Sequence, residues 1–156
     1  MLLDRFGRST NHHVANDVAW YCLLAPGAVA NHAAPVRLAQ FAVDNAPEDE
    51  KPNFLNTLGA ALYRAGRSQE ALRRLEEGIR KRGGESLPQD WVFLAMAHHQ
   101  LGHDGEARRL LDRLRAHRPN ENPDAFWNEL EIRPLRREAE AVLRLDPVFP
   151  ADPFAP

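Results

Sequence analysis

Leu55-Asn56-Thr57-Leu58-Gly59-Ala60-Ala61-Leu62, followed by Ala71-Leu72-Arg73-Arg74-Leu75, is the stretch that decides the fold. The same design returns as Trp91-Val92-Phe93-Leu94-Ala95-Met96-Ala97-His98, followed by Ala107-Arg108-Arg109-Leu110-Leu111. In both copies an alanine follows the first large apolar residue after 16 residues, and the copies lie 36 residues apart (55 and 71, then 91 and 107). The spacing of the apolar residues within each block is helical. The repetition therefore predicts two helical hairpins of the same kind.

Small residues in these blocks have a steric reason. Gly59 and Ala71 in the first copy are expected where two antiparallel helices approach most closely, and Ala95 and Ala107 have the same places in the second. A further apolar stripe of helical spacing precedes them, at Val14, Val18, Tyr21, Cys22 and Leu24. It predicts a third, less regular hairpin at the start of the chain.

Proline and glycine set the expected boundaries of the elements. The sequence predicts hairpins over residues 12–47, 52–84 and 88–119, then a covering helix over 120–145 that Pro134 interrupts or kinks. Irregular, mobile segments are expected at residues 1–11 and in the proline-rich residues 146–156. The residues expected to cap helices are Ser68, Asp104 and Asn122.

The order of these residues resembles the tetratricopeptide repeat, whose signature is W-x2-L-G-x2-Y, then A-x3-F and a closing proline. The resemblance covers residues 12–119 and ends on Pro119; in the first hairpin Val18-Ala19-x-x-Cys22 fills the places of L-G-x-x-Y. The copies are two residues further apart than the family's period of ~34 residues, and the turn at residues 83–86 can hold the extra pair. The resemblance implies an all-α fold, a right-handed α-solenoid of three hairpins with a C-terminal capping helix. The amino-acid sequence of the repeats is also similar to the repeat tails of large bacterial multidomain proteins, some of them serine/threonine protein kinases.

In this family partners usually lie along the concave face, which the first helix of each hairpin lines. Carried over to this chain, the resemblance implies a partner-binding surface made of Asn16, Trp20, Asn56, Ala60, Tyr63, Arg64, Met96, His99 and Gln100. Such a mixed lining suits an extended peptide or a helix, with Trp20 and Tyr63 as anchors and the two asparagines bonding to its backbone. The alternative for the two aromatic residues is that they pack between neighbouring helices.

One specialisation of the family is not expected here. Members that grip the C-terminal carboxylate of a partner use Lys and Asn on the first such helix and Lys and Arg on the third. The matching positions of this chain hold Asn16, Trp20, Gln89 and Phe93. The sequence therefore does not predict a carboxylate clamp.

Composition narrows the classes of partner. The formal net charge is −2 and the pI about 6.4, so no basic surplus draws the chain to nucleic acid or to an anionic membrane. The basic run over residues 73–82 contains Glu76 and Glu77 at ion-pairing spacing, which favours a solvated helix face over RNA or phosphate binding. No apolar run approaches the ~18 residues of a membrane span, and the first residues do not resemble a signal peptide. A cytoplasmic protein is expected.

The residues that could carry chemistry have simpler interpretations. His98, His99 and His103 might suggest a metal site, but Gly102 ends the helix before the last of them and no Glu accompanies them as in H-E-x-x-H. Cys22 lies mid-helix on the apolar face, where a thiol packs and stays inert. We expect neither a metal nor a cofactor, and no catalytic activity.

The sequence thus predicts a non-catalytic scaffold for protein–protein interaction, which binds a peptide or a partner helix on its concave face. The alternative is an accessory, regulatory or oligomerisation segment of a larger signalling enzyme such as a serine/threonine protein kinase. Self-association is compatible with both.

Overall fold

The computed structural model describes residues 2–118 and 123–144, and all regular structure in these ranges is helical. The helices are α1 (Leu2–Phe6), α2 (His12–Tyr21), α3 (Ala33–Asn45), α4 (Lys51–Arg64), α5 (Ser68–Lys81), α6 (Pro88–Gln100), α7 (Asp104–Ala116) and α8 (Pro123–Arg144). The prediction of an all-α fold is confirmed for this part of the chain. None of the described helices is both long enough and apolar enough to cross a lipid bilayer.

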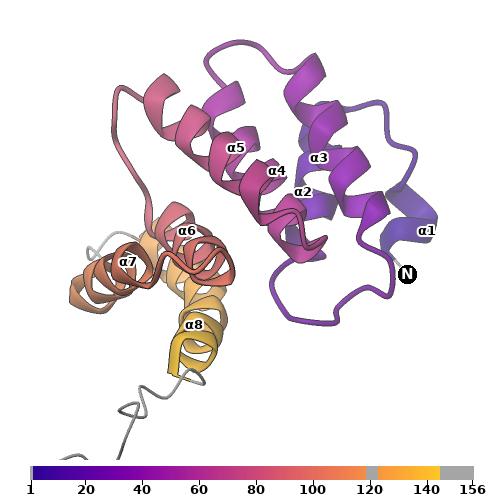
Figure 1. Ribbon diagram of the computed structural model, residues 1–156. Helices are drawn as coiled ribbons and strands as arrows, with labels where there is room; N and C mark the ends of the chain where they lie inside the picture. Colours follow the sequence, from indigo (N-terminus) through magenta and orange to yellow (C-terminus); the bar gives the residue numbers. More distant parts are fainter. Residues whose placement is uncertain (1, 119–122, 145–156) are drawn as a thin grey trace, which may run out of the picture.

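Successive helices pack as pairs (Figure 1). The most extensive contacts are between α4 and α5, between α6 and α7 and between α2 and α3. The pairs also meet one another in chain order, because α3 packs on α4, α5 packs on α6, and the first helices of the pairs touch as α2–α4 and α4–α6. The line of first helices α2, α4 and α6 is therefore continuous through the molecule.

Two of the pairs are joined by the same turn. Gly66 after α4 and Gly102 after α6 have φ of 75° and 76°, a left-handed backbone that favours glycine. In each turn the next residue donates its backbone N–H to a carbonyl five residues back, Arg67 to Leu62 and His103 to His98, both at 2.9 Å. These bonds satisfy helix-end carbonyls and reverse the chain within three residues, so that the second helix folds back on the first.

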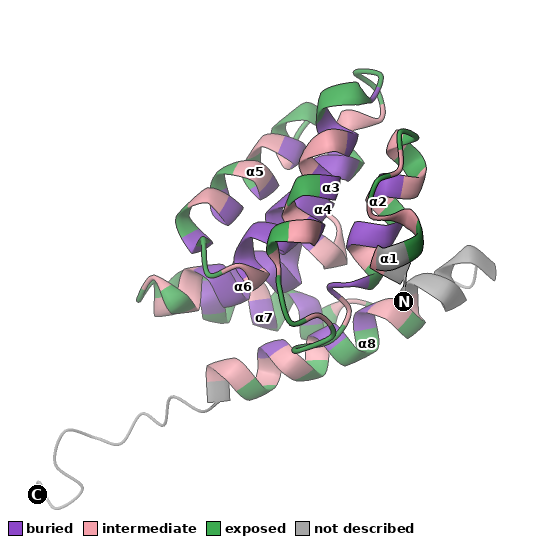
Figure 2. Ribbon diagram, turned by 90° about the vertical axis from the view of Figure 1, so that its right-hand side faces the viewer, coloured by how far each residue is buried: buried purple, intermediate pink, exposed green. Residues whose placement is uncertain are grey.

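The small residues do lie at a close approach, as predicted. A Cβ added to Gly59 would come 2.5 Å from Leu75 Cγ and 3.3 Å from the Ala71 carbonyl oxygen. Ala71, Ala95 and Ala107 have no exposed surface. Helices α4 and α6 each contribute more buried residues than any other described helix, whereas the second helices of the pairs alternate between buried and exposed positions (Figure 2).

Helix α8 lies across the first helices. It packs on α6 and α7, and its side chains bond to Trp20 of α2 and Arg64 of α4. Its buried apolar residues are Ile132, Leu135 and Ala139. The covering helix that the sequence predicted thus reaches all three pairs.

Several local predictions need correction. Ser68 and Asp104 are the first residues of α5 and α7 and make no capping bond, because their side chains bond to Gln100 and His99 instead. Helix α8 contains Pro134 in its interior, so this proline does not interrupt it. Helix α2 ends at Tyr21, before Leu24, which is the last residue of the predicted apolar stripe. Residues 1–11 include the short helix α1. The predicted cap Asn122 and the tail 146–156 lie outside the described residues.

Candidate functional site

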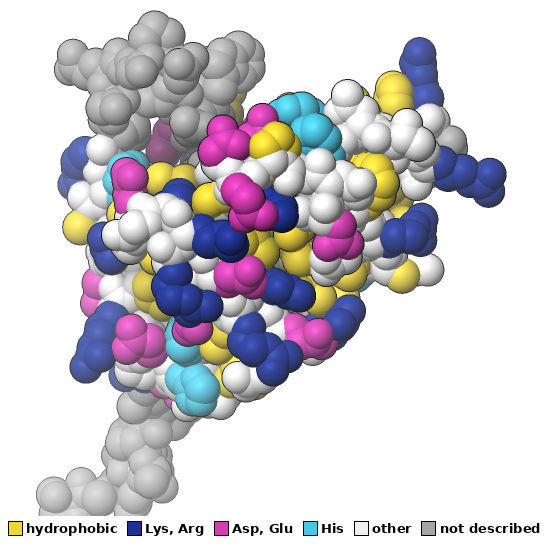
Figure 3. All heavy atoms as spheres, turned by 90° about the horizontal axis from the view of Figure 1, so that it is seen from above, with side chains coloured by type: hydrophobic (Ala, Val, Ile, Leu, Met, Phe, Trp, Pro, Cys, Tyr) yellow, Lys and Arg dark blue, Asp and Glu magenta, His cyan; other side chains and the backbone are white. Residues whose placement is uncertain are grey.

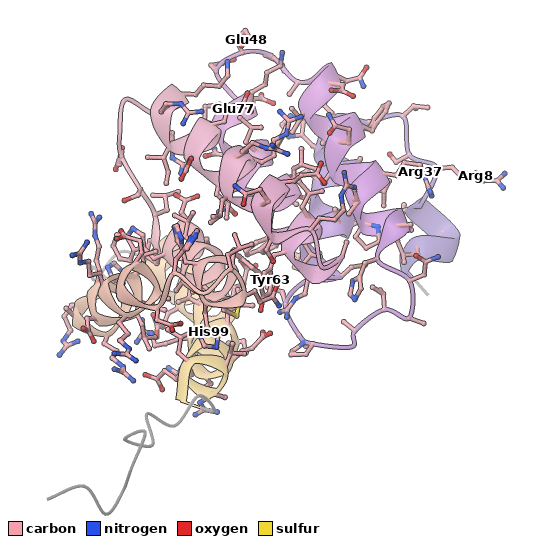
Figure 4. All side chains as sticks on the ribbon, viewed as in Figure 1. Arg8, Arg37, Glu48, Tyr63, Glu77 and His99 are labelled. Atoms are coloured by element: carbon pink, nitrogen blue, oxygen red, sulfur yellow. The ribbon has the colours of Figure 1, made fainter. Side chains whose placement is uncertain are left out.

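The structure separates the nine residues expected to form one partner-binding surface. Ala60 and Met96 are completely buried, and Tyr63 is 6% exposed. Tyr63 lies between α4 and α6 (Figure 4), with its ring 6.0 Å from that of Phe93. The expectation that these three residues face a partner is corrected: they belong to the core. The alternative interpretation, packing between neighbouring helices, describes Tyr63.

Burial also changes the acidity of Tyr63. Removal from water raises the pKa of its phenol to about 12, and the nearby Glu138 carboxylate acts in the same direction. A phenol in this setting stays neutral at physiological pH. It acts as an apolar ring with a polar end and not as an exposed anchor for a partner.

Arg64 is used by the chain itself. Its guanidinium forms a two-pronged ion pair with Glu138 of α8, in which Nη2 lies 2.7 Å from Oε2. Nε and Nη2 also donate to the carbonyl oxygen of Leu23 after α2, at 3.1 and 2.9 Å. The side chains of Arg64 and Glu138 are only 6% and 13% exposed. Arg64 therefore joins α2, α4 and α8, and is not available to a partner in this structure.

His99 and Gln100 also bond within the molecule. The Nδ1 atom of His99 lies 3.0 Å from a carboxylate oxygen of Asp104, and Gln100 accepts a hydrogen bond from Ser68. His99 lies beside α8, where a small hollow also contains Leu143 (Figure 4). Both residues are at the end of α6 that is remote from the cleft described next.

Asn16, Trp20 and Asn56 do come together, in a cleft of about 520 Å³ between α2, α4, α6 and α8. Its remaining lining residues are Asn53, Thr57, Arg82, Leu87, Pro88, Gln89, His117, Glu129, Glu131 and Ile132. The amides Asn16, Asn53, Asn56 and Gln89 come from three successive first helices. We call this hollow the amide cleft.

A buried network holds one wall of the amide cleft. Asp90 has no exposed surface, and its carboxylate accepts from Asn56 Nδ2 and from the backbone N–H of Leu87, both at 2.8 Å, and from Arg82. Asp90 thereby closes the first turn of α6 and ties it to α4. Sequence reasoning missed Asp90 and Arg82. The signal was an aspartate two residues after Pro88 at the start of α6, a favoured place for a carboxylate at a helix N-terminus.

The opposite wall holds an unsatisfied polar atom. The side-chain oxygen of Asn16 is buried and has no hydrogen-bond partner among the described residues. Leaving a buried acceptor unpaired costs about 1–3 kcal/mol. Trp20, beside it, donates from Nε1 to Glu131 of α8 at 2.9 Å, and its ring meets Phe93 edge-on at 6.2 Å. A buried acceptor without a partner calls for an explanation, such as a bound water molecule or ion at that place.

The charges around the amide cleft are unequal. Arg82 is neutralised by Asp90, whereas Glu129 and Glu131 contribute carboxylates from α8. Glu129 lies 3.8 Å from Arg136, and the one bond that Glu131 accepts from the described side chains is from a neutral indole N–H. The lining therefore favours a neutral or basic ligand over an acidic one.

The other residues considered for chemistry lie outside the amide cleft: the three histidines lie around the turn between α6 and α7, and Cys22, expected mid-helix, is the residue that follows α2. The Nδ1 atoms of His98 and His103 lie 3.2 Å apart, while His99 faces Asp104, so the three histidines do not converge. Burial lowers the pKa of His98, with His103 acting in the same direction. Burial likewise raises the pKa of the Cys22 thiol, which favours its inert, protonated form.

The basic run of α5 is ion-paired, as expected. Arg74 lies 2.9 Å from Glu77, and Arg80 lies 4.0 Å from Glu76. Acidic and basic side chains alternate on the face shown in Figure 3.

No protein-family model, curated protein or solved structure matches the chain. The described residues define an all-helical protein of consecutive helix pairs, with a long helix across the first helix of each pair. Its function must therefore be inferred from the amide cleft.

Proposed function

We propose that the chain is a non-catalytic scaffold of the tetratricopeptide type, a right-handed α-solenoid that binds an extended peptide segment in the amide cleft. The observation that carries the proposal is the buried, unpaired side-chain oxygen of Asn16, which lies in the same cleft as the amides of α4 and α6. A peptide backbone offers N–H donors and carbonyl acceptors in alternation. Amide side chains can satisfy both, whatever the sequence of the peptide.

The repeated construction of the chain supports the first half of this proposal. The pairs α4–α5 and α6–α7 are joined by the same glycine turn, at positions 36 residues apart (66 and 102). The first helices touch in succession. A stack of this kind holds the amides on rigid helices, so little ordering entropy is lost when a peptide binds.

The peptide should be neutral or basic. Because Asp90 already holds Arg82, the spare charge of the lining is the carboxylate of Glu131. A lysine or arginine of the peptide would pair with it. A peptide with a free C-terminal carboxylate would gain nothing, because the lining offers it no unpaired cation.

The test is a selection of peptides from a random displayed library against the full chain, followed by affinity measurements on the selected peptides. Replacing Asn16 or Gln89 by Leu should weaken binding by roughly 2- to 12-fold each, the value of one backbone hydrogen bond. Gln40→Leu is the matched control, because Gln40 is on α3 outside the cleft and bonds to Asp44. Selected peptides should be enriched in Lys and Arg.

Two results would refute the proposal. One is a selection that retains no peptide above the background of an unrelated helical protein. The other is a set of peptides whose affinities are the same for the two cleft variants and for the Gln40→Leu control.

A further inference from the structure

A second group of side chains converges outside the amide cleft, where the start of α2 meets the start of α4. His12 and His13 are the first two residues of α2, and Glu50 is the residue before α4. His12 Nε2 lies 3.4 Å and His13 Nε2 lies 3.3 Å from the same oxygen, Oε2 of Glu50. One potential ligand atom from each residue lies within 4.8 Å of the other two.

The Glu50 oxygen is itself unusual. Oε2 is buried and accepts no hydrogen bond from the described residues, although two imidazole nitrogens face it. A buried carboxylate oxygen without a hydrogen-bond partner is unfavourable, because it has lost its contact with water and gained no donor in exchange. The contacts with the imidazoles are too long and too poorly aligned to remove that cost. A cation between the three atoms would remove it.

The separations fit a tetrahedral metal ion. Two ligand atoms at the usual zinc distances of about 2.0–2.2 Å, separated by a tetrahedral angle, lie about 3.4 Å from each other. The two nitrogen–oxygen distances, 3.4 and 3.3 Å, agree with this edge length, and the two imidazole nitrogens lie within 4.8 Å of each other. Two imidazoles and one carboxylate are a ligand set that Zn²⁺ accepts, with the fourth position left for water or for a further ligand.

The surroundings keep the two rings in place. The centroids of the His12 and His13 rings are 4.4 Å apart, and both rings pack against Phe54 of α4, at 6.0 and 5.6 Å. Phe54 is 6% exposed. A buried apolar wall on one side lowers the local dielectric and strengthens the attraction between a cation and the Glu50 carboxylate.

We propose that His12, His13 and Glu50 bind one Zn²⁺ ion that ties the first helix of the first pair to that of the second. The ion would bridge α2 and α4, which among the described residues are also joined by packing and by the bonds of Arg64 to the Leu23 carbonyl oxygen after α2. This site is independent of the amide cleft.

The test uses the untagged full chain, freed of metal with a chelator and titrated with Zn²⁺ and, separately, with Co²⁺. We expect one bound ion per chain, the intense visible absorption of four-coordinate Co²⁺, and a higher melting temperature with Zn²⁺. His12→Ala, His13→Ala and Glu50→Gln should each weaken Zn²⁺ binding by at least about 100-fold, since even a residue that only orients a metal ligand is worth 10–100-fold.

The matched control is the double variant His98→Ala, His103→Ala, which removes the other close histidine pair and should bind Zn²⁺ like the wild type. Glu50→Gln keeps the size of the side chain and removes no capping bond, so its fold should be unchanged by circular dichroism. Equal affinity of the wild type and the three ligand variants would overturn the proposal. So would loss of binding in the control alone, or binding no tighter than that of a chain lacking all three ligands.

Discussion

The ion pair between Arg64 and Glu138 offers the sharpest test of how α8 is held. We expect Glu138→Leu to destabilise the protein by about 3–5 kcal/mol, because it leaves a buried guanidinium without its counter-charge. The two side chains are 6% and 13% exposed, so water cannot replace the lost partner. An exposed pair would be worth only about 0–1 kcal/mol.

Removing the other partner of the pair, by Arg64→Met, should lower the free energy of unfolding by a similar amount, for two reasons. Arg64→Met leaves the Glu138 carboxylate unpaired, and it also removes the donor of the Leu23 carbonyl oxygen, which by itself costs about 1–3 kcal/mol. The double variant removes both charges, and replacing a buried pair by apolar side chains is often neutral or stabilising by 1–4 kcal/mol. We therefore expect the double variant to lie within about 2 kcal/mol of the wild type, and above both single variants.

The assay is urea unfolding followed by far-ultraviolet circular dichroism for the four proteins. Domains of this size have about 5–15 kcal/mol of stability, so a single variant that is partly unfolded in buffer is measured in trimethylamine N-oxide, with the other three under the same conditions. Costs that simply add in the double variant would refute the coupling. Single-variant costs below about 1 kcal/mol would show that α8 is not held by this pair.

Three further predictions follow from the packing. Gly59→Ala should lower the free energy of unfolding by up to about 2 kcal/mol, because the new methyl group would lie 2.5 Å from a side-chain carbon of α5, and overpacking costs about 1–3 kcal/mol against the ~1 kcal/mol gained in helix propensity. Gly105→Ala, where an added Cβ meets nothing within 4 Å, should raise it instead. Equal melting temperatures of the two variants would contradict this. In a Tyr21→Phe background, the absorbance of the Tyr63 phenol should titrate with a pKa of about 12. Because the phenol of the unfolded chain ionises near pH 10, the free energy of unfolding should fall as the pH rises from about 10 to 12. A titration midpoint near pH 10 in the folded protein would refute the burial of Tyr63. In the folded protein Cys22 should react with a thiol reagent far more slowly than in the protein unfolded by urea, since burial raises the pKa of its thiol. Equal reaction rates in the two states would show that the end of α2 does not bury Cys22.

The hairpins could be predicted because their signals are local. Each of these signals acts over a few residues or across one pair of helices. They are the apolar stripe of a helix, the glycines that allow φ near 75° after α4 and α6, and the small residue opposite Leu75. The sequence around Gly59 therefore predicted both the helix and its close packing against the next helix. The tetratricopeptide identity of the array and its handedness stay predictions.

The amide cleft could not be predicted in the same way, because its position depends on what covers the first helices. The residues of α8 that face them are Glu131, Ile132, Leu135, Glu138 and Ala139, which lie on one helical stripe. Two acidic residues in an otherwise apolar stripe indicate partners elsewhere in the chain. The sequence does not say which ones, since Trp20 and Arg64 lie 111 and 74 residues away from theirs.

The position of α8 also explains where a ligand could enter. Its two acidic residues bond to Trp20 and Arg64, and its apolar residues are buried. The part of the first helices beside this stripe is therefore occupied by the chain's own helix, as it would be by a bound partner. What is left is the amide cleft, where Asn16 offers an acceptor that α8 does not use. A peptide that satisfies that acceptor can bind without displacing α8, so its affinity should not depend on the Arg64–Glu138 pair. Peptides that bind the double variant of that pair much more tightly than the wild type would instead show that α8 competes for the same surface.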